Sequence, residues 1–143
     1  MGRSDTVRMG FTGTQLGMTR AQKSEVARVL VNAKATEVHH GDCIGADAEF
    51  HDIVRMVDPK IKIHVHPPAE DKKRAFKRGD VLYPAKPYLE RNHDIVDACE
   101  ILIATPAQKN EVLRSGTWAT IRYARKIKRS TIIITPNGNS ELK

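Results

Sequence analysis

The chain contains 143 residues, of which 40% are hydrophobic. This size supports one hydrophobic core and not two, so we expect a single domain over residues 1–143. No apolar run is long enough for a signal peptide or a membrane span, and the two cysteines lack metal-ligand spacing. We therefore expect a cytoplasmic protein without disulfides, bound metal, cofactor or membrane partner. A formal net charge of +7 predicts an anionic partner, with nucleotides and nucleic acids as the main candidates.

The first predicted unit is a strand at residues 7–12, a glycine-containing turn and a helix at residues 19–34. Apolar residues alternate with polar ones in the strand and recur every three or four residues in the helix. Thr19 and Gln22 match a capping box, which fixes where the helix starts. The turn GTQLG matches neither the dinucleotide fingerprint nor a Walker loop. It is consistent both with a tight connection and with a phosphate site over a helix N-terminus.

The remaining periodic segments also alternate between strands and helices. They are strands at residues 37–40, 61–66, 101–104 and 131–135 and helices at residues 46–56, 87–98 and 117–127. This alternation predicts an α/β fold of the Rossmann-like type, with a single doubly wound, mostly parallel five-stranded sheet and helices on both faces. Ligands bind at the carboxyl ends of the strands in such folds, so we expect three glycine-containing loops to form one site there.

A basic segment at residues 67–87 interrupts this alternation as an insertion. It is rich in proline and shows no sustained periodicity, and its cations are Lys72, Lys73, Arg74, Lys77, Arg78 and Lys86. It is either a solvated surface loop or a lid that brings cations and the rings of Phe76, Tyr83 or Tyr88 over a phosphate-bearing ligand.

Four segments in a fixed order suggest a family. They are GFTGTQLGMT at residues 10–19, HGDCIGADAEFH at 40–51, RNHDIVDACEILIATP at 91–106 and RSGTWATIRYARK at 114–126. Their order and spacing resemble the SLOG superfamily, which includes the LOG phosphoribohydrolases and the DprA proteins, and most closely its small YspA/YpsA-related branch. The resemblance implies a small-molecule ligand that is a nucleotide or a nucleotide derivative similar to ADP-ribose, and a homo-oligomer.

The resemblance also implies which residues bind the ligand and its phosphate. They are Gly13, Thr14, Gln15, Gly17, Gly41, Asp42, Gly45, Arg91, Asn92, Arg114, Ser115, Gly116 and Thr117. Residues 115–117 resemble the GGxGT phosphate loop of the family, and their hydroxyls and amides can donate to phosphate oxygens. Simple N-capping of the following helix explains the same residues without a ligand. For Arg91 and Asn92 the alternative is a solvated helix turn whose charge is balanced by Asp94 and Asp97.

The case for catalysis is weaker than the case for binding. In LOG enzymes a glutamate follows the GGxGT loop, whereas Trp118, Ala119 and Thr120 stand there in this chain. Asp47 and Glu111 are the candidate replacements, although Asp47 also suits a helix cap or a ribose contact and Glu111 a surface ion pair with Arg114.

Three functions remain open on this evidence. The favoured one is binding of a nucleotide derivative without turnover. The second is hydrolysis or transfer at an N-glycosidic bond, and the third is nucleic-acid binding through the basic segment, which predicts a steep salt dependence.

The histidines and the tryptophan leave further alternatives. Asp47 and His51 share a helix face and can form an acid–base pair, but a third metal ligand is missing, and a hydrogen-bonding role for His51 is preferred. His64 and His66 alternate on one strand and are interpreted as a partly exposed edge pair. Trp118 either stacks on a ligand ring or packs against a loop or a neighbouring subunit.

Overall fold

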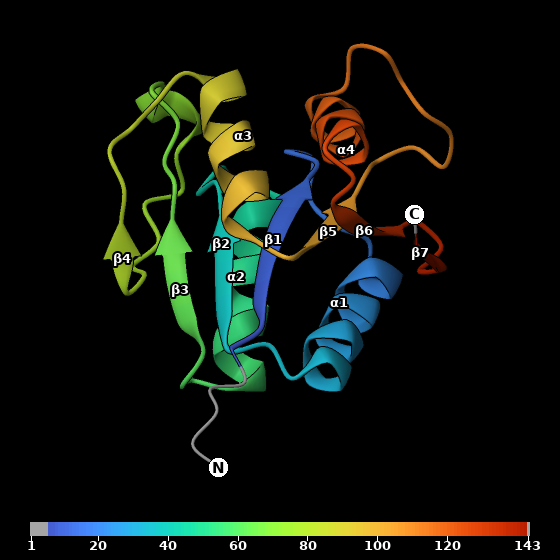
Figure 1. Ribbon diagram of the computed structural model, residues 1–143, viewed down its shortest axis with the longest axis horizontal. Helices are drawn as coiled ribbons and strands as arrows, with labels where there is room; N and C mark the ends of the chain where they lie inside the picture. Colours follow the sequence, from blue (N-terminus) through green and yellow to red (C-terminus); the bar gives the residue numbers. More distant parts are fainter. Residues whose placement is uncertain (1–5, 143) are drawn as a thin grey trace.

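The protein is a seven-stranded sheet flanked by four α-helices, in a computed structural model that describes residues 6–142 (Figure 1). The elements in chain order are β1 (Arg8–Gly13), α1 (Arg20–Ala33), β2 (Glu37–His40), α2 (Ala46–Val57), β3 (Lys62–Val65), the short 3₁₀ helix η1 (Asp71–Lys73), β4 (Val81–Leu82), α3 (Tyr88–Ala98), β5 (Ile101–Thr105), α4 (Gly116–Lys126), β6 (Ser130–Ile134) and β7 (Ser140–Leu142). All neighbouring strands pair in parallel except β6 and β7. The predicted mostly parallel α/β sheet is confirmed.

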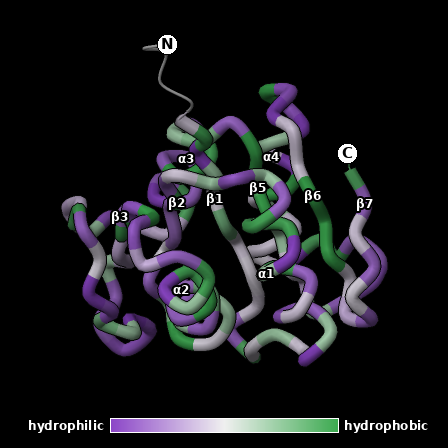
Figure 2. The backbone as a smooth tube through the Cα atoms, turned by 90° about the horizontal axis from the view of Figure 1, so that it is seen from below, coloured by the Kyte–Doolittle hydropathy of each residue, from purple (hydrophilic) through white to green (hydrophobic). Residues whose placement is uncertain are grey.

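Helices cover both faces of the sheet, as the doubly wound prediction requires. Figure 2 shows α1 and α2 on one side of the strands and α3 and α4 on the other. The larger apolar cluster lies under α1 and α2, where the rings of Phe11 and Phe50 stack at 4.2 Å. Smaller clusters around Leu102 and Ile121 lie under α3 and α4. Burial of these side chains holds the helices against the sheet.

The strand order places a topological switch in the middle of the sheet. The order is β4-β3-β2-β1-β5-β6-β7, so the chain leaves β1 toward one edge and returns to build β5 on its other side. At the carboxyl ends of these two strands, Gly13 pairs with Thr105. The loops that follow β1 and β5 diverge from this point, which creates a crevice in folds of this kind.

The predicted number of five strands is wrong, because β4 and β7 were not predicted. The strand β4 has two residues and lies inside the basic segment, which also contains η1, so no alternation marks it. The strand β7 pairs antiparallel with β6 after a turn in which Gly138 has a φ of 87°. An Asn-Gly turn of this kind is a hairpin signal that the sequence does contain.

The start of α1 forms as its sequence predicts. Thr19 and Gln22 make both hydrogen bonds of the capping box at the start of α1. The buried Gln22 side chain goes further, because its Nε2 donates to the carbonyls of Pro106 and Ile134, each at 2.9 Å. One side chain thereby ties the start of α1 to the carboxyl ends of β5 and β6, next to the switch point.

Candidate functional site

A cavity of about 290 Å³ occupies the switch point. Its lining residues are Gly13, Thr14, Gln15, Leu16, Tyr88, Ala107, Gln108, Ser115, Gly116 and Thr117. Six of the residues implied by the family resemblance, three from the loop after β1 and three from the start of α4, therefore lie together around one hollow. Its volume is close to the lower end of the range for small-molecule sites.

The N-terminus of α4 supplies the donors of this cavity. Ser115 is the N-cap, and its Oγ accepts from the amide of Trp118 at 3.2 Å, so the capping alternative is realised. Capping uses only that amide, and the N–H groups of Gly116 and Thr117 have no hydrogen-bond partner among the described residues. These two amides and the positive end of the helix dipole face the hollow that residues 115–117 line, and both favour an anion.

The loop after β1 contributes less of its backbone than expected. The amide of Thr14 donates to Thr105 O at 3.3 Å, that of Gly17 to Thr14 O at 3.1 Å, and that of Leu16 to Thr14 Oγ1 at 3.1 Å. Gly17 has a φ of 97° and acts as a turn residue outside the lining. The loop therefore offers the ligand the Gln15 amide and side chain more than a ring of free amides.

The glycines of the loop after β2 serve close packing. Gly45 has a φ of 89°, and a Cβ there would collide with the backbone carbonyl of Gln15. A Cβ at Gly41 would collide with the guanidinium of Arg91. Neither glycine lines the cavity, but Gly45 allows the β2 loop to support the β1 loop from behind.

Asp42 anchors the basic segment. Its side chain is fully buried, accepts from Arg74 Nε at 2.8 Å, and accepts from the amide of Lys77 at 2.9 Å. Its backbone carbonyl also accepts from the amide of Ala75 at 2.7 Å. The carboxylate is therefore engaged with residues 74–77, and Asp42 does not line the cavity.

Arg91 and Asn92 are buried, so the solvated-turn alternative is wrong. Arg91 donates to the carbonyls of Gly41 and His66 and, through Nε, to Asn92 Oδ1 at 2.8 Å. Its guanidinium also lies 4.8 Å from the ring centre of Tyr88. Arg91 cross-links the loops after β2 and β3 and supports Tyr88, which lines the cavity.

The two candidate acids have very different surroundings. Asp47 is buried and accepts from the amide of Cys43 at 3.1 Å, and burial raises its pKa to about 6 although the charge of Arg91 acts in the opposite direction. Glu111 is exposed and pairs with Arg122 and Arg125, and the hydrogen bond from Arg122 lowers its pKa. Neither carboxylate lines the cavity.

Arg114 and the basic segment supply the cations near the site. Arg114 is exposed directly before the α4 cap and forms no ion pair within residues 6–142. In the basic segment Arg74, Lys77 and Lys86 pair with Asp42, Asp52 and Asp94. Lys73 instead extends toward the crevice, with its Nζ 3.5 Å from Gln15 Oε1.

A second hollow of about 240 Å³ lies beside the first. It is lined by Pro68, Ala69, Glu70, Lys73, Pro87 and Tyr88, so the Tyr88 ring separates the two hollows. Of the three rings considered for a lid, only Tyr88 reaches the cavity, since Tyr83 stacks on His66 at 4.1 Å and Phe76 packs under Arg74. The sequence did not indicate Leu16, Ala107 or Gln108, although the last two directly follow a strand end.

The histidines and Trp118 contact other parts of the protein. His51 bonds to His40, ring nitrogen to ring nitrogen, at 2.9 Å and makes no hydrogen bond to Asp47 among the described residues. His64 and His66 are buried, so their interpretation as an exposed edge pair is wrong, because β4 and Tyr83 cover β3. Trp118 is buried in the core cluster with Ile121, which excludes the stacked-ligand alternative.

Comparisons with known proteins define the fold. No family model and no curated protein matches the sequence. The molybdenum cofactor binding protein from the phototrophic bacterium Rippkaea orientalis superposes with a TM-score of 0.71 at 12% identity, over 93% of this chain and 78% of its own. The structural-genomics target TM1055 superposes with a TM-score of 0.63 at 14% identity, over 88% of this chain and 72% of its own. At these identities the likeness shows a shared Rossmann-like fold. Within residues 6–142, no helix has the length and apolar character that a bilayer crossing requires.

Proposed function

We propose that this protein binds a nucleotide or a nucleotide derivative similar to ADP-ribose in the crevice between the loop after β1 and the start of α4. The main support is the pair of N-terminal α4 amides, which have no partner within residues 6–142 and border a cavity at the switch point of the sheet. A phosphate over Gly116 and Thr117 would accept from these amides. The exposed Arg114 lies beside this position and can add a bidentate contact.

The second hollow can hold the base of such a ligand. The first hollow, at about 290 Å³, suits a phosphate and a sugar, and the neighbouring prolines and Tyr88 form a more enclosed, more apolar hollow that suits a base. Lys73 borders both this surface and Gln15. The molybdenum cofactor binding protein with the same fold supports small-molecule binding in general and does not define the ligand of this chain.

Calorimetric titration with ribose 5-phosphate, AMP and ADP-ribose tests the proposal. We expect Gly116→Ala, which narrows the gap between Gly116 and Tyr88, and Arg114→Gln, which removes the nearest unpaired cation, each to weaken binding about tenfold, or about 1.4 kcal/mol. Lys60→Gln, an exposed charge removal at the amino end of β3, is the matched control and should bind normally. Equal affinities in all three variants would place the ligand elsewhere.

Catalysis at an N-glycosidic bond is the second candidate, because burial holds the pKa of Asp47 near 6, where a carboxylic acid can act as a proton donor. Chromatography of nucleotides incubated with the protein distinguishes the two functions. Binding alone predicts no released base. Release of base by the native protein that is lost in Asp47→Asn would show that the protein is a hydrolase and that Asp47 is its acid.

Nucleic-acid binding through the basic segment is the third candidate and has the least support. Three of its six cations are paired with aspartates, which lowers the charge available for phosphates. Fluorescence anisotropy with single- and double-stranded oligonucleotides at two salt concentrations would detect it as a steeply salt-dependent affinity.

Self-association is also part of the proposal. The apolar side chains of Leu16, Leu89 and Leu113 are exposed next to crevice residues, and their burial would favour a dimer that closes the crevice. Sedimentation analysis with Leu113→Glu as the disrupting variant tests this: a monomer in both proteins would remove this part of the proposal.

A further inference from the structure

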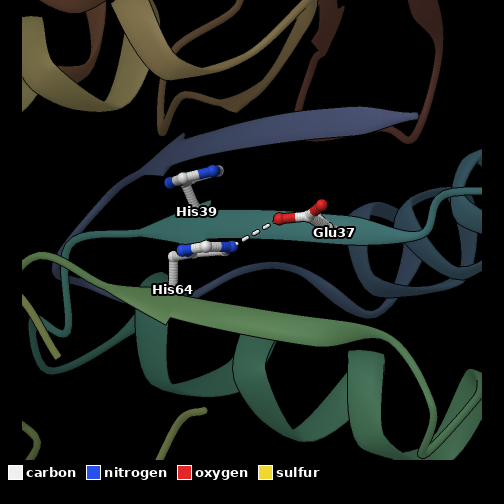
Figure 3. Close-up of side chains that lie close together, drawn as sticks. All are labelled: Glu37, His39 and His64. Atoms are coloured by element: carbon white, nitrogen blue, oxygen red, sulfur yellow. Dashed lines mark hydrogen bonds and ion pairs between the residues drawn. The ribbon is translucent and has the colours of Figure 1, made fainter. Parts of the chain in front are cut away.

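A second group of chemically active side chains lies on β2 and β3, away from the crevice. We refer to Glu37, His39, His64, His66 and Tyr83 as the histidine layer. In the register of the two strands His39 lies opposite His64, and Glu37 lies two residues before His39, so the three side chains share one face of the sheet. Figure 3 shows them projecting to the same side, with the two imidazole rings stacked and the Glu37 carboxylate next to His64. One ligand atom from each lies within 4.8 Å of the other two.

We propose that Glu37, His39 and His64 form a binding site for one divalent transition-metal ion of the Zn²⁺ type. Two imidazole nitrogens and one carboxylate oxygen are a donor set that Zn²⁺ accepts when water completes the coordination. No sequence pattern indicates this site, because His39 and His64 are far apart in the chain and only the strand register brings them together.

Hydrogen bonds hold the Nδ1 atoms of the two imidazoles, and because the rings stack with an interplanar angle of 11°, at least one ring must turn about its Cβ–Cγ bond to bring both Nε2 atoms to one ion. Nδ1 of His39 lies 2.9 Å from Nε2 of His66, and Nδ1 of His64 lies 2.9 Å from the hydroxyl of Tyr83. Histidines that ligate metals almost always donate their second ring nitrogen to such a partner, which fixes the tautomer and the ring orientation. With both Nδ1 atoms donating, Nε2 of each ring remains as the ligand atom.

The metal would replace a proton that the layer now shares. Nε2 of His64 lies 2.6 Å from Oε1 of Glu37, so these two atoms are joined by one proton in the metal-free protein. Binding of M²⁺ at Nε2 releases that shared proton to solvent, while Nδ1 of His64 keeps its own proton and donates it to the Tyr83 oxygen. No other atom is gained or lost, and the charge of the site rises by one.

The charges around the layer tolerate this change. His39 is only 3% exposed, and burial disfavours a positive charge on its imidazole. Arg8 is the nearest cation that acts on His39, and Arg8 is itself paired with Glu100. Lys86, whose charge adds to burial in lowering the pKa of His66, is likewise paired with Asp94.

The site has one open side. His39 and His64 are buried, whereas the Glu37 side chain is 25% exposed, so an ion would enter past the carboxylate. Three protein ligands and one solvent-facing position are the arrangement of zinc sites that keep a bound water. The alternative is a packing layer without metal, since the rings of His39 and His64 already stack at 4.1 Å.

Metal titration of the chelator-treated full chain decides between them. We expect one Zn²⁺ per chain by calorimetry and, with Co²⁺ as a probe, the visible absorption of a four-coordinate ion. Glu37→Gln keeps the shape of the side chain and an acceptor for His64 while removing the charge, and we expect it to weaken binding by about 100-fold. Tyr83→Phe removes only the oxygen behind His64 and should cost about tenfold, within the range known for such supporting bonds.

His93→Gln is the matched control, because His93 lies on α3 and stacks on Tyr123 at 3.7 Å, outside the layer. It should bind both ions as the native chain does. The proposal fails if the native chain takes up neither ion, or if Glu37→Gln and His93→Gln bind with equal affinity. Because Glu37 is partly exposed, its variant is expected to fold, and circular dichroism checks this before titration. Failure here leaves nucleotide binding in the crevice untouched, since the two sites share no residue.

Discussion

The crevice and the histidine layer lie on the same sheet but differ in how their polar groups are satisfied. In the crevice, two α4 amides have no partner among the described residues, and the buried Thr105 hydroxyl, which lies behind the lining residue Gly13, has none either. In the layer, the side chains of His39, His64 and Glu37 bond to one another or to their neighbours. A ligand can therefore bind in the crevice by forming new hydrogen bonds, whereas a metal ion can bind in the histidine layer only by replacing a proton. Substitutions that separate these two modes test the comparison.

The largest effect is expected from Gly45→Ala, because Gly45 packs against the backbone of the β1 loop that lines the crevice. The residue would have to keep a φ of 89° while its Cβ met the Gln15 carbonyl. We expect unfolding free energy to fall by about 3 kcal/mol, the sum of backbone strain and overpacking. Urea unfolding followed by circular dichroism measures it.

Gly116→Ala is the control for this substitution. Gly116 opens α4 in an ordinary helical conformation, and its new Cβ meets only the edge of the Tyr88 ring. Its stability should stay within about 1 kcal/mol of the native value, because alanine favours the helix. Similar losses in both variants would show that the crevice does not depend on the contact between the β1 and β2 loops.

The next effect concerns Asp47, which lies behind the crevice. Burial raises its pKa from an ordinary value of 3.8 to about 6, so the folded protein binds more protons than the unfolded chain between these pH values. Stability must therefore fall as pH rises through this window, by about 2–3 kcal/mol relative to Asp47→Asn, which cannot titrate. Urea unfolding of both proteins at pH 4 and pH 7 measures the difference.

Asp52→Asn is the control here, since Asp52 is exposed and pairs with Lys77 at the surface. This variant keeps Asp47, so its stability should fall with rising pH as that of the native protein does. If the difference in stability between the native chain and Asp47→Asn does not depend on pH, then Asp47 titrates normally. That result would weaken the argument for an acid catalyst.

Local signals made half of the crevice predictable. The capping box at Thr19 and the cap at Ser115 each lie within four residues of the partner they bond, and the alternation of helices and strands implies which loops meet at one sheet edge. The sequence therefore predicted a mostly parallel sheet, though not all of its strands, and its four helices, and residues 13–15 and 115–117, which the resemblance implied, lie around one hollow.

Long-range pairing explains what the sequence missed. Asp42 bonds to Arg74, and Arg91 bonds to the Gly41 carbonyl 50 residues away. The burial of Asp42 and Arg91 and their structural roles therefore do not follow from the local sequence pattern. The histidine layer depends on the register of β2 with β3, which a one-residue slip would abolish. The cover that buries His64 comes from β4, which is too short to give a periodic signal.

A smaller effect is expected within the layer from Tyr83→Phe in the metal-free protein. The change removes the hydroxyl 2.9 Å from His64 Nδ1 and keeps the ring that stacks on His66. We expect a loss of about 1 kcal/mol, the ordinary net value of such a hydrogen bond. Urea unfolding measures it, and an unchanged stability would mean that water replaces the hydroxyl and that the layer is not fully paired.

The smallest effect is expected at Thr105, and its sign is the opposite. The Thr105 hydroxyl is buried without a partner against Gly13, so Thr105→Val should stabilise the protein by up to about 1 kcal/mol by removing an unpaired polar group. Thr131→Val is the matched control on β6, because the equally buried Thr131 hydroxyl donates to the Arg129 carbonyl at 3.1 Å and its loss should destabilise by about 1 kcal/mol. Opposite signs in thermal unfolding would show that the protein keeps an unpaired hydroxyl behind Gly13 at the expense of stability. The same sign in both variants would mean that the two hydroxyls are equally satisfied, and the contrast between an open crevice and a closed layer would then rest on the α4 amides alone.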